Sequence, residues 1–94
     1  MGAFITKPFL LEHDRIQVNA DARRGMVKVE ITDEWGKPIE KYDAKRANAV
    51  TGNGLNLDLT WKDKVNVKDL KNRVVRLRVY MVRSRLYAFH FVID

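Results

Sequence analysis

The sequence predicts an all-β fold, an antiparallel β-sandwich of jelly-roll-like type with about eight strands. Apolar and polar residues alternate with a period of two through most of the chain, which is the pattern of strands that bury one face. Short segments rich in glycine, asparagine and aspartate separate these runs, as turns between antiparallel strands do. A small barrel of the OB-fold type is the alternative architecture.

Length and composition bound the class of protein. Ninety-four residues predict one domain, residues 1–94, and 46% hydrophobic with 32% charged residues favours folding over disorder. The chain has no cysteine, which excludes disulfides and thiolate metal sites. No apolar run reaches the ~20 residues of a membrane span, and the N-terminus lacks the pattern of a signal peptide. We expect a domain of a longer chain without a membrane partner.

Three alternating runs predict strands in the first two thirds of the chain, at residues 15–20, 26–31 and 55–61. Their inward residues are Ile16, Val18 and Ala20, then Val27, Val29 and Ile31, and then Leu55, Leu57, Leu59 and Trp61. Trp61 shares the leucine stripe and is therefore expected in the core. Residues 67–72 are the stretch that can form a helical turn.

Facing residues of a hairpin must share a face of the sheet, and this rule gives a register for the first two runs. Ala20 opposite Val27 also aligns Val18 with Val29, around a loop centred on residues 23–24. We therefore expect the first two strands to form a hairpin.

The last run, residues 74–91, alternates arginine with large apolar residues. Placing Val79 opposite Phe89 gives a second hairpin around Ser84 and keeps the arginines outside the core. The same register puts Arg78 opposite His90 on the outer face.

Eighteen Lys and Arg against 12 Asp and Glu give a net charge of +6 and a pI near 9.8. This balance favours anionic partners, nucleic acid among them. Cations on solvent-facing strand positions also improve solubility and protect sheet edges from pairing. No basic run is concentrated enough to decide, so both readings stay open.

The sequence offers no convincing catalytic group, and we expect that the chain is not an enzyme. His13 and His90 are the only histidines, and neither has partners at a defined spacing. Asp33 and Glu34 are adjacent in a turn, where carboxylates are ordinary. No cofactor is expected.

Structural Ca²⁺ is the one ion for which loop oxygens are present. Asn53, Asp58 and Asp43 could supply them, but their spacing matches no recognised calcium loop. We therefore expect no metal.

Several side chains are candidates for ligand binding: Trp35, Tyr42, Arg76, Arg78, Tyr80 and His90. Trp35 lies at a turn tip, where its ring could stack on a sugar or pack against a proline. The arginines and Tyr80 share the predicted outer face, which could meet an acidic polysaccharide, single-stranded nucleic acid or a neighbouring domain.

The chain also resembles a known family in the order of its motifs. Residues 2–9, GAFITKPF, are similar to an "x-L-x-T-K-P-F" opening, and residues 27–39, VKVEITDEWGKPI, to a "V-E-I-x-D-x-x-G-x-P-I" hairpin. Residues 59–62, LTWK, are similar to a "W-K/x-G" motif, and residues 70–91 to a "V-R-L-R … L-Y-x-F-x-F" ending. This order resembles the C-terminal β-sandwich module of many bacterial glycoside-hydrolase-like and sialidase-like β-propeller proteins.

The resemblance implies a non-catalytic accessory domain of a carbohydrate-active, extracytoplasmic protein. Its partner would be the parent catalytic domain or a glycan. A structural protein-interaction module that uses the outer Arg and Tyr face is the alternative, and binding of nucleic acid or another polyanion is a further one.

Overall fold

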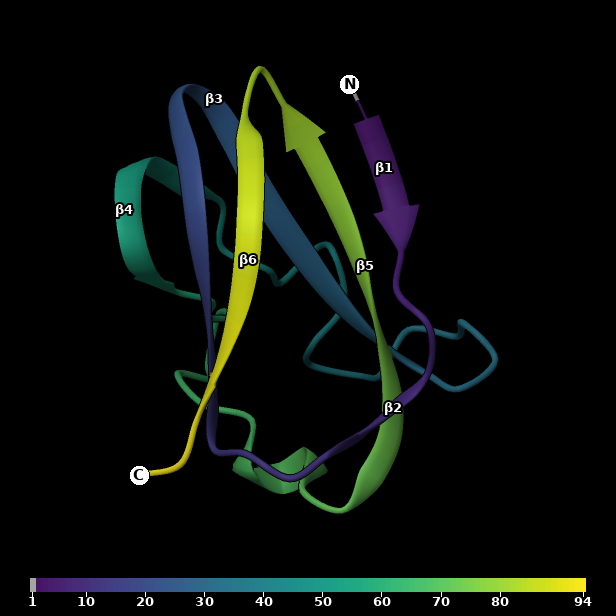
Figure 1. Cartoon of the computed structure of the whole chain (residues 1–94). Coiled ribbons are helices and arrows are strands. Elements are labelled where there is room, and N and C mark those ends of the chain that lie inside the picture. Colours follow the sequence, from purple (N-terminus) through teal and green to yellow (C-terminus); the bar gives the residue numbers. More distant parts are fainter. Residues whose placement is uncertain (1) are drawn as a thin grey trace.

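The computed structural model describes residues 2–94, and Met1 of the expected domain lies outside them. These residues form an all-β fold, as the alternation predicts, with six strands rather than about eight (Figure 1). The elements are β1 (Gly2–Ile5), β2 (Phe9–Leu11), β3 (Arg15–Asp33), β4 (Val50–Asp58), the 3-10 turn η1 (Lys68–Leu70), β5 (Arg73–Val82) and β6 (Arg85–Val92). No helix among residues 2–94 has the length and apolarity needed to cross a bilayer.

The 19-residue strand β3 organises the sheet, because β4, β5 and β6 all pair with it. Its first half pairs with β6, for example Val18 with Phe89, and its second half pairs with β5, for example Val29 with Val79. All pairings are antiparallel. The chain reverses direction near residues 22–26 and again between β5 and β6, so that a two-stranded ribbon folds over at one corner (Figure 1).

Both predicted hairpins are wrong. Val18 pairs with Phe89 instead of Val29, and no register joins β5 to β6 within the described residues. The rule that facing residues share a face holds equally for strand partners and for residues that meet across a core. The rule therefore identifies which residues face inward, but it does not show which of them are paired in the sheet. The two runs expected as separate strands are the halves of β3, which lowers the strand number.

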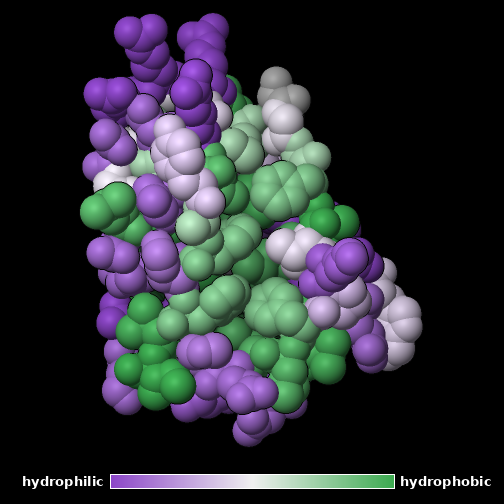
Figure 2. All heavy atoms as spheres, viewed as in Figure 1, coloured by the Kyte–Doolittle hydropathy of each residue, from purple (hydrophilic) through white to green (hydrophobic). Residues whose placement is uncertain are grey.

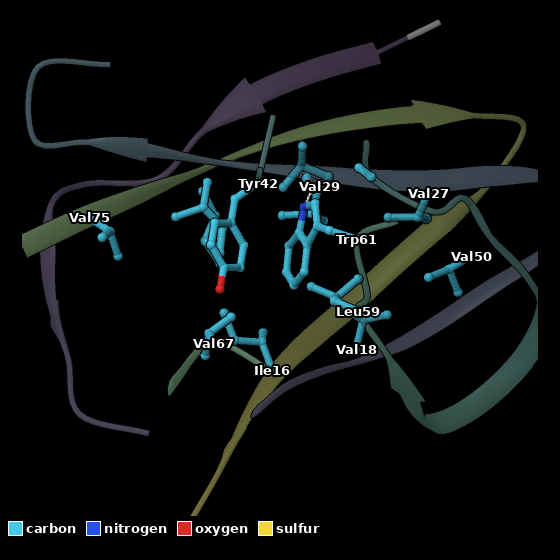
Figure 3. Close-up of a cluster of buried hydrophobic side chains, with 14 of the residues drawn as sticks. Ile16, Val18, Val27, Val29, Tyr42, Val50, Leu59, Trp61, Val67 and Val75 are labelled. Carbon is cyan, nitrogen blue, oxygen red and sulfur yellow. Dashed lines mark hydrogen bonds between the residues drawn. The ribbon is translucent and has the colours of Figure 1, made fainter. Parts of the chain in front are cut away.

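The core lies between the two halves of the folded sheet (Figure 3). Trp61 is 1% exposed, which confirms the predicted core position, and its indole Nε1 donates a hydrogen bond to the carbonyl oxygen of Val29 at 3.0 Å. Tyr42 packs edge-on against Trp61 with ring centroids 5.3 Å apart. The leucine stripe is only partly inward, because Leu55 is 69% exposed whereas Leu59 is buried.

One side of the core is not closed by main-chain pairing. β1 and β2 pair with the outer edge of β5, but no strand of residues 2–94 pairs with the outer edge of β6. β5 runs up to the corner and β6 runs down from it, and β1 and β6 flank this open side (Figure 1). Apolar side chains along it remain partly exposed.

Candidate functional site

Arg78, expected on a free outer face, is engaged inside the protein. Its Nη1 lies 2.8 Å from Oε1 of Glu30, and its Nη2 donates to the carbonyl oxygen of Gly36 at 3.1 Å. The other oxygen of Glu30 accepts a hydrogen bond from the backbone N–H of Ala44 at 2.8 Å. Since the Glu30 side chain is only 6% exposed, this ion pair holds three segments together and offers little to a ligand.

Arg76 also has an internal partner, because its Nε donates to the carbonyl oxygen of Thr6 at 2.8 Å. The Thr6 hydroxyl in turn accepts a hydrogen bond from the backbone N–H of Leu77 at 3.0 Å. These contacts tie the segment between β1 and β2 to β5.

His90 does not lie opposite Arg78 as expected. It is exposed and pairs with Gln17, whereas Arg78 lies between Glu30 and Ile5 in the sheet. Tyr80 is half-buried between β1 and β3, and Arg76 and Arg78 precede it at alternate positions of β5. Arg76, Arg78 and Tyr80 thus share one face of β5, whereas His90 lies apart from them on β6.

Tyr42 is a core residue, 2% exposed. Burial raises the pKa of its phenol, and the nearby Asp69 carboxylate adds to this rise. Among residues 2–94 no group hydrogen-bonds the phenol oxygen. The main-chain bond from Ile31 N–H to the Tyr42 carbonyl oxygen, 2.9 Å, fixes the tyrosine against β3, so its ring is not presented to a surface ligand.

Trp35 is 81% exposed. It lies in a well-ordered turn, where Oδ1 of Asp33 accepts hydrogen bonds from the backbone N–H groups of Trp35 and Lys37 at 3.0 and 2.9 Å. Gly36 has φ of +87°, a conformation that favours glycine. The turn thus presents the indole to solvent on a rigid base.

The open side of the core carries an apolar surface that we call the aromatic seam: Phe4, Phe9, Met81, Leu86, Phe89 and Phe91. In Figure 2 it forms a continuous hydrophobic band down the face between β6 and the β1–β5 side. The rings of Phe9 and Phe91 meet edge-on at 5.4 Å, which joins β2 to β6 through side chains alone. Phe4 remains 46% exposed and Phe91 37%.

The seam was not predicted from the sequence, although a signal for it was present. All four phenylalanines of the chain are in it, two from the first nine residues and two from the last six. Aromatics at both ends of a chain indicate that its two terminal segments meet. The predicted hairpin between β5 and β6 obscured this, because it paired Phe89 with β5.

The carboxylates considered for metal binding or catalysis lie apart. Asp58 accepts hydrogen bonds from Arg15 at 3.3 Å and Gln17 at 2.9 Å, and Asp43 is paired with Arg46 at 3.1 Å. Within residues 2–94 no three His, Cys, Asp or Glu side chains gather as a metal-binding group would.

Comparison with known proteins gives no relative: no family model, curated protein or solved structure matches this chain.

Proposed function

We propose that the chain is a non-catalytic accessory module of a carbohydrate-active protein, with a jelly-roll-like β-sandwich fold. In this proposal it packs against the neighbouring domain of the same polypeptide through the aromatic seam. The observation that supports it best is the position of all four phenylalanines along the open side of the core. The resemblance of the motif order to C-terminal accessory modules suggests the kind of parent protein.

The exposure of the seam favours docking over a solvated surface. Phe4 and Phe91 keep 46% and 37% of their surface exposed, although both project to the inward side of the sheet. Contiguous apolar surface of this kind marks interaction sites. The free edges of β1 and β6 also offer main-chain donors and acceptors beside it. Arg76 and Arg78 are engaged internally, so the outer arginine face is the weaker docking candidate.

The test uses the neighbouring domain of the longer polypeptide to which, in this proposal, the module belongs. The isolated neighbouring domain is titrated into the ¹⁵N-labelled module, and we expect chemical-shift changes centred on the seam. Phe4→Asp places a carboxylate in the contact and should weaken association about tenfold or more, because an unpaired charge is costly to bury.

Val74→Asp is the matched control, because Val74 is 41% exposed but projects from β5 beside Leu10, outside the seam. It should leave association unchanged. Equal weakening by both variants, or no shift changes at millimolar concentration, contradicts the proposal. The module could instead dimerise, and Phe4→Asp could abolish the dimer. That outcome would identify a second copy of the module, rather than the neighbouring domain, as the partner of the seam.

Weak glycan binding at Trp35 is a second candidate, supported by the 81% exposure of the indole on a rigid turn. Stacking of a sugar on an indole is lost when the ring is removed. Trp35→Ala should therefore abolish retention on glycan affinity gels, while Leu55→Ala, a change at a similarly exposed apolar residue, should not. Absence of wild-type retention on every glycan removes this candidate.

A further inference from the structure

Four arginines meet at the corner where the ribbon folds over. Arg23 and Arg24 come from the bend of β3, Arg83 comes from the connection between β5 and β6, and Arg85 is the first residue of β6. Together with Asp21 and Ser84 they line an open hollow. In Figure 2 hydrophilic side chains project from this end of the molecule. We call this group the arginine corner.

The backbone fixes the two arginine-bearing segments against each other. A Cβ atom at Gly25 would lie 1.7 Å from the carbonyl oxygen of Val82, so only glycine permits this close crossing. The Ser84 hydroxyl donates a hydrogen bond to the carbonyl oxygen of Met26 at 3.0 Å. The arginines are therefore brought together by the fold rather than by free loops.

The charges of the corner are not balanced. Asp21 accepts hydrogen bonds from Nε and Nη2 of Arg23 at 3.0 and 2.9 Å, which accounts for one arginine. Arg24, Arg83 and Arg85 form no salt bridge in the described part of the chain, residues 2–94, although Arg85 lies opposite Asp21 in the β3–β6 pairing. The corner thus holds three excess positive charges of the net +6 in one place. Such a concentration raises the local density of anions.

Arg83 is also held in an unfavourable backbone conformation. Its φ is +43°, in the left-handed region that disfavours residues with a side chain by roughly 1–2 kcal/mol. Glycine would fit this position with less strain. Backbone strain of this kind gathers at functional sites, where the side chain is what matters.

We propose that Arg24, Arg83 and Arg85 bind the acidic groups, sulfate or carboxylate, of an anionic polysaccharide. Guanidinium groups recognise such oxyanions through paired N–H donors. Nucleic acid fits less well, because single strands are bound on successive aromatic rings. Tyr87, 59% exposed two positions beyond Arg85, is the one exposed aromatic of β6 near the corner. The choice of a polysaccharide rests on the carbohydrate-linked function proposed above; the site itself does not.

The test measures binding of dextran sulfate, polygalacturonate, neutral dextran and a thymidine oligonucleotide by calorimetry from 50 to 300 mM salt. The corner variant is Arg24→Gln/Arg83→Gln/Arg85→Gln. The control is Lys7→Gln/Lys45→Gln/Lys62→Gln, which lowers the net charge equally at exposed lysines elsewhere. We expect the wild type to bind an acidic polysaccharide, and the corner variant to bind about tenfold more weakly at 50 mM salt with a flatter salt dependence. The control should stay within about twofold.

Preference for dextran sulfate or for polygalacturonate identifies the acidic group. Equal weakening in both triple variants shows a response to net charge alone and overturns the site. Binding of neither acidic polysaccharide at 50 mM salt overturns it too. If the wild type binds the oligonucleotide more tightly than either acidic polysaccharide, and the corner variant loses this binding, the ligand of the corner is nucleic acid and the polysaccharide proposal is overturned. The corner variant should still dock to the neighbouring domain, so failure here and failure of seam docking are distinguishable.

Discussion

The ion pair between Glu30 and Arg78 shows that a strand face expected to be solvent-exposed can instead form a buried contact that stabilises the fold. A carboxylate that is 94% buried needs a cation and further donors to offset its lost hydration, and here Arg78 and the N–H of Ala44 supply them. The alternation of β5 predicts that Arg78 leaves the core side. It says nothing of Gly36 and Glu30, which lie 42 and 48 residues away in the sequence.

Arg78→Met should destabilise the protein by about 2 kcal/mol, because it leaves the Glu30 carboxylate buried without its cation. Urea unfolding measures this change. Adding Glu30→Gln removes the orphaned charge and keeps an acceptor for Ala44, so the double variant should recover about half of the loss. Arg73→Met, the same change at an exposed position of β5, should stay within about 0.5 kcal/mol of the wild type. A loss at Arg73 as large as at Arg78 contradicts this account.

At the scale of elements, the sequence determined faces better than partners. Val18, Val29 and Val79 are all inward, as alternation predicts, since side-chain parity is a local property. The choice between a hairpin and a folded ribbon depends on the corner at Gly25, where two backbones nearly touch. A glycine in a run of alternating residues is equally typical of an ordinary turn, so this contact had no separate signal. The aromatic seam and the arginine corner depend on the same fold-over and were missed with it.

Gly25→Ala tests the corner directly. The added methyl group would overlap the Val82 carbonyl oxygen, which is backbone and cannot rotate away, so the two strands must separate. We expect a loss of at least about 3 kcal/mol in urea unfolding. Gly2→Ala is the control, since nothing lies within 4 Å of a Cβ atom there, and it should change stability by less than about 0.5 kcal/mol. Similar stability of the two variants would show that the ribbon does not cross as described.

For the whole molecule, Asp14 joins parts of the chain that alternation alone could not bring together. Its Oδ1 lies 2.7 Å from Nζ of Lys71, next to η1, and its Oδ2 accepts from the backbone N–H of Asp94 at 2.8 Å. Its carbonyl oxygen accepts from the N–H of Val67 at 2.8 Å. The all-β class was predictable because it is the sum of local patterns. These long-range ties were not, and the sequence shows only their isolated charges.

The contacts of Asp14 predict how stability depends on pH. The hydrogen bond from Lys71, with that from the Asp94 N–H, lowers the pKa of the Asp14 carboxyl below its ordinary 3.8. The unfolded chain therefore takes up a proton at higher pH than the folded protein does. The contribution of Asp14 to the free energy of unfolding is complete at pH values above the pKa of Asp14 in the unfolded chain. It is lost as the pH falls through the lower pKa of Asp14 in the folded protein.

Asp14→Asn should accordingly reduce stability at pH 7 and flatten the decline between pH 5 and pH 2, as measured by urea unfolding across that range. Asp63→Asn, at an exposed carboxylate with no ion pair among residues 2–94, is the control and should retain the wild-type decline. A ¹³C titration of the Asp14 carboxyl gives the direct readout. A midpoint at or above 3.8 would mean that Lys71 and the backbone N–H of Asp94 do not hold the charged form of Asp14.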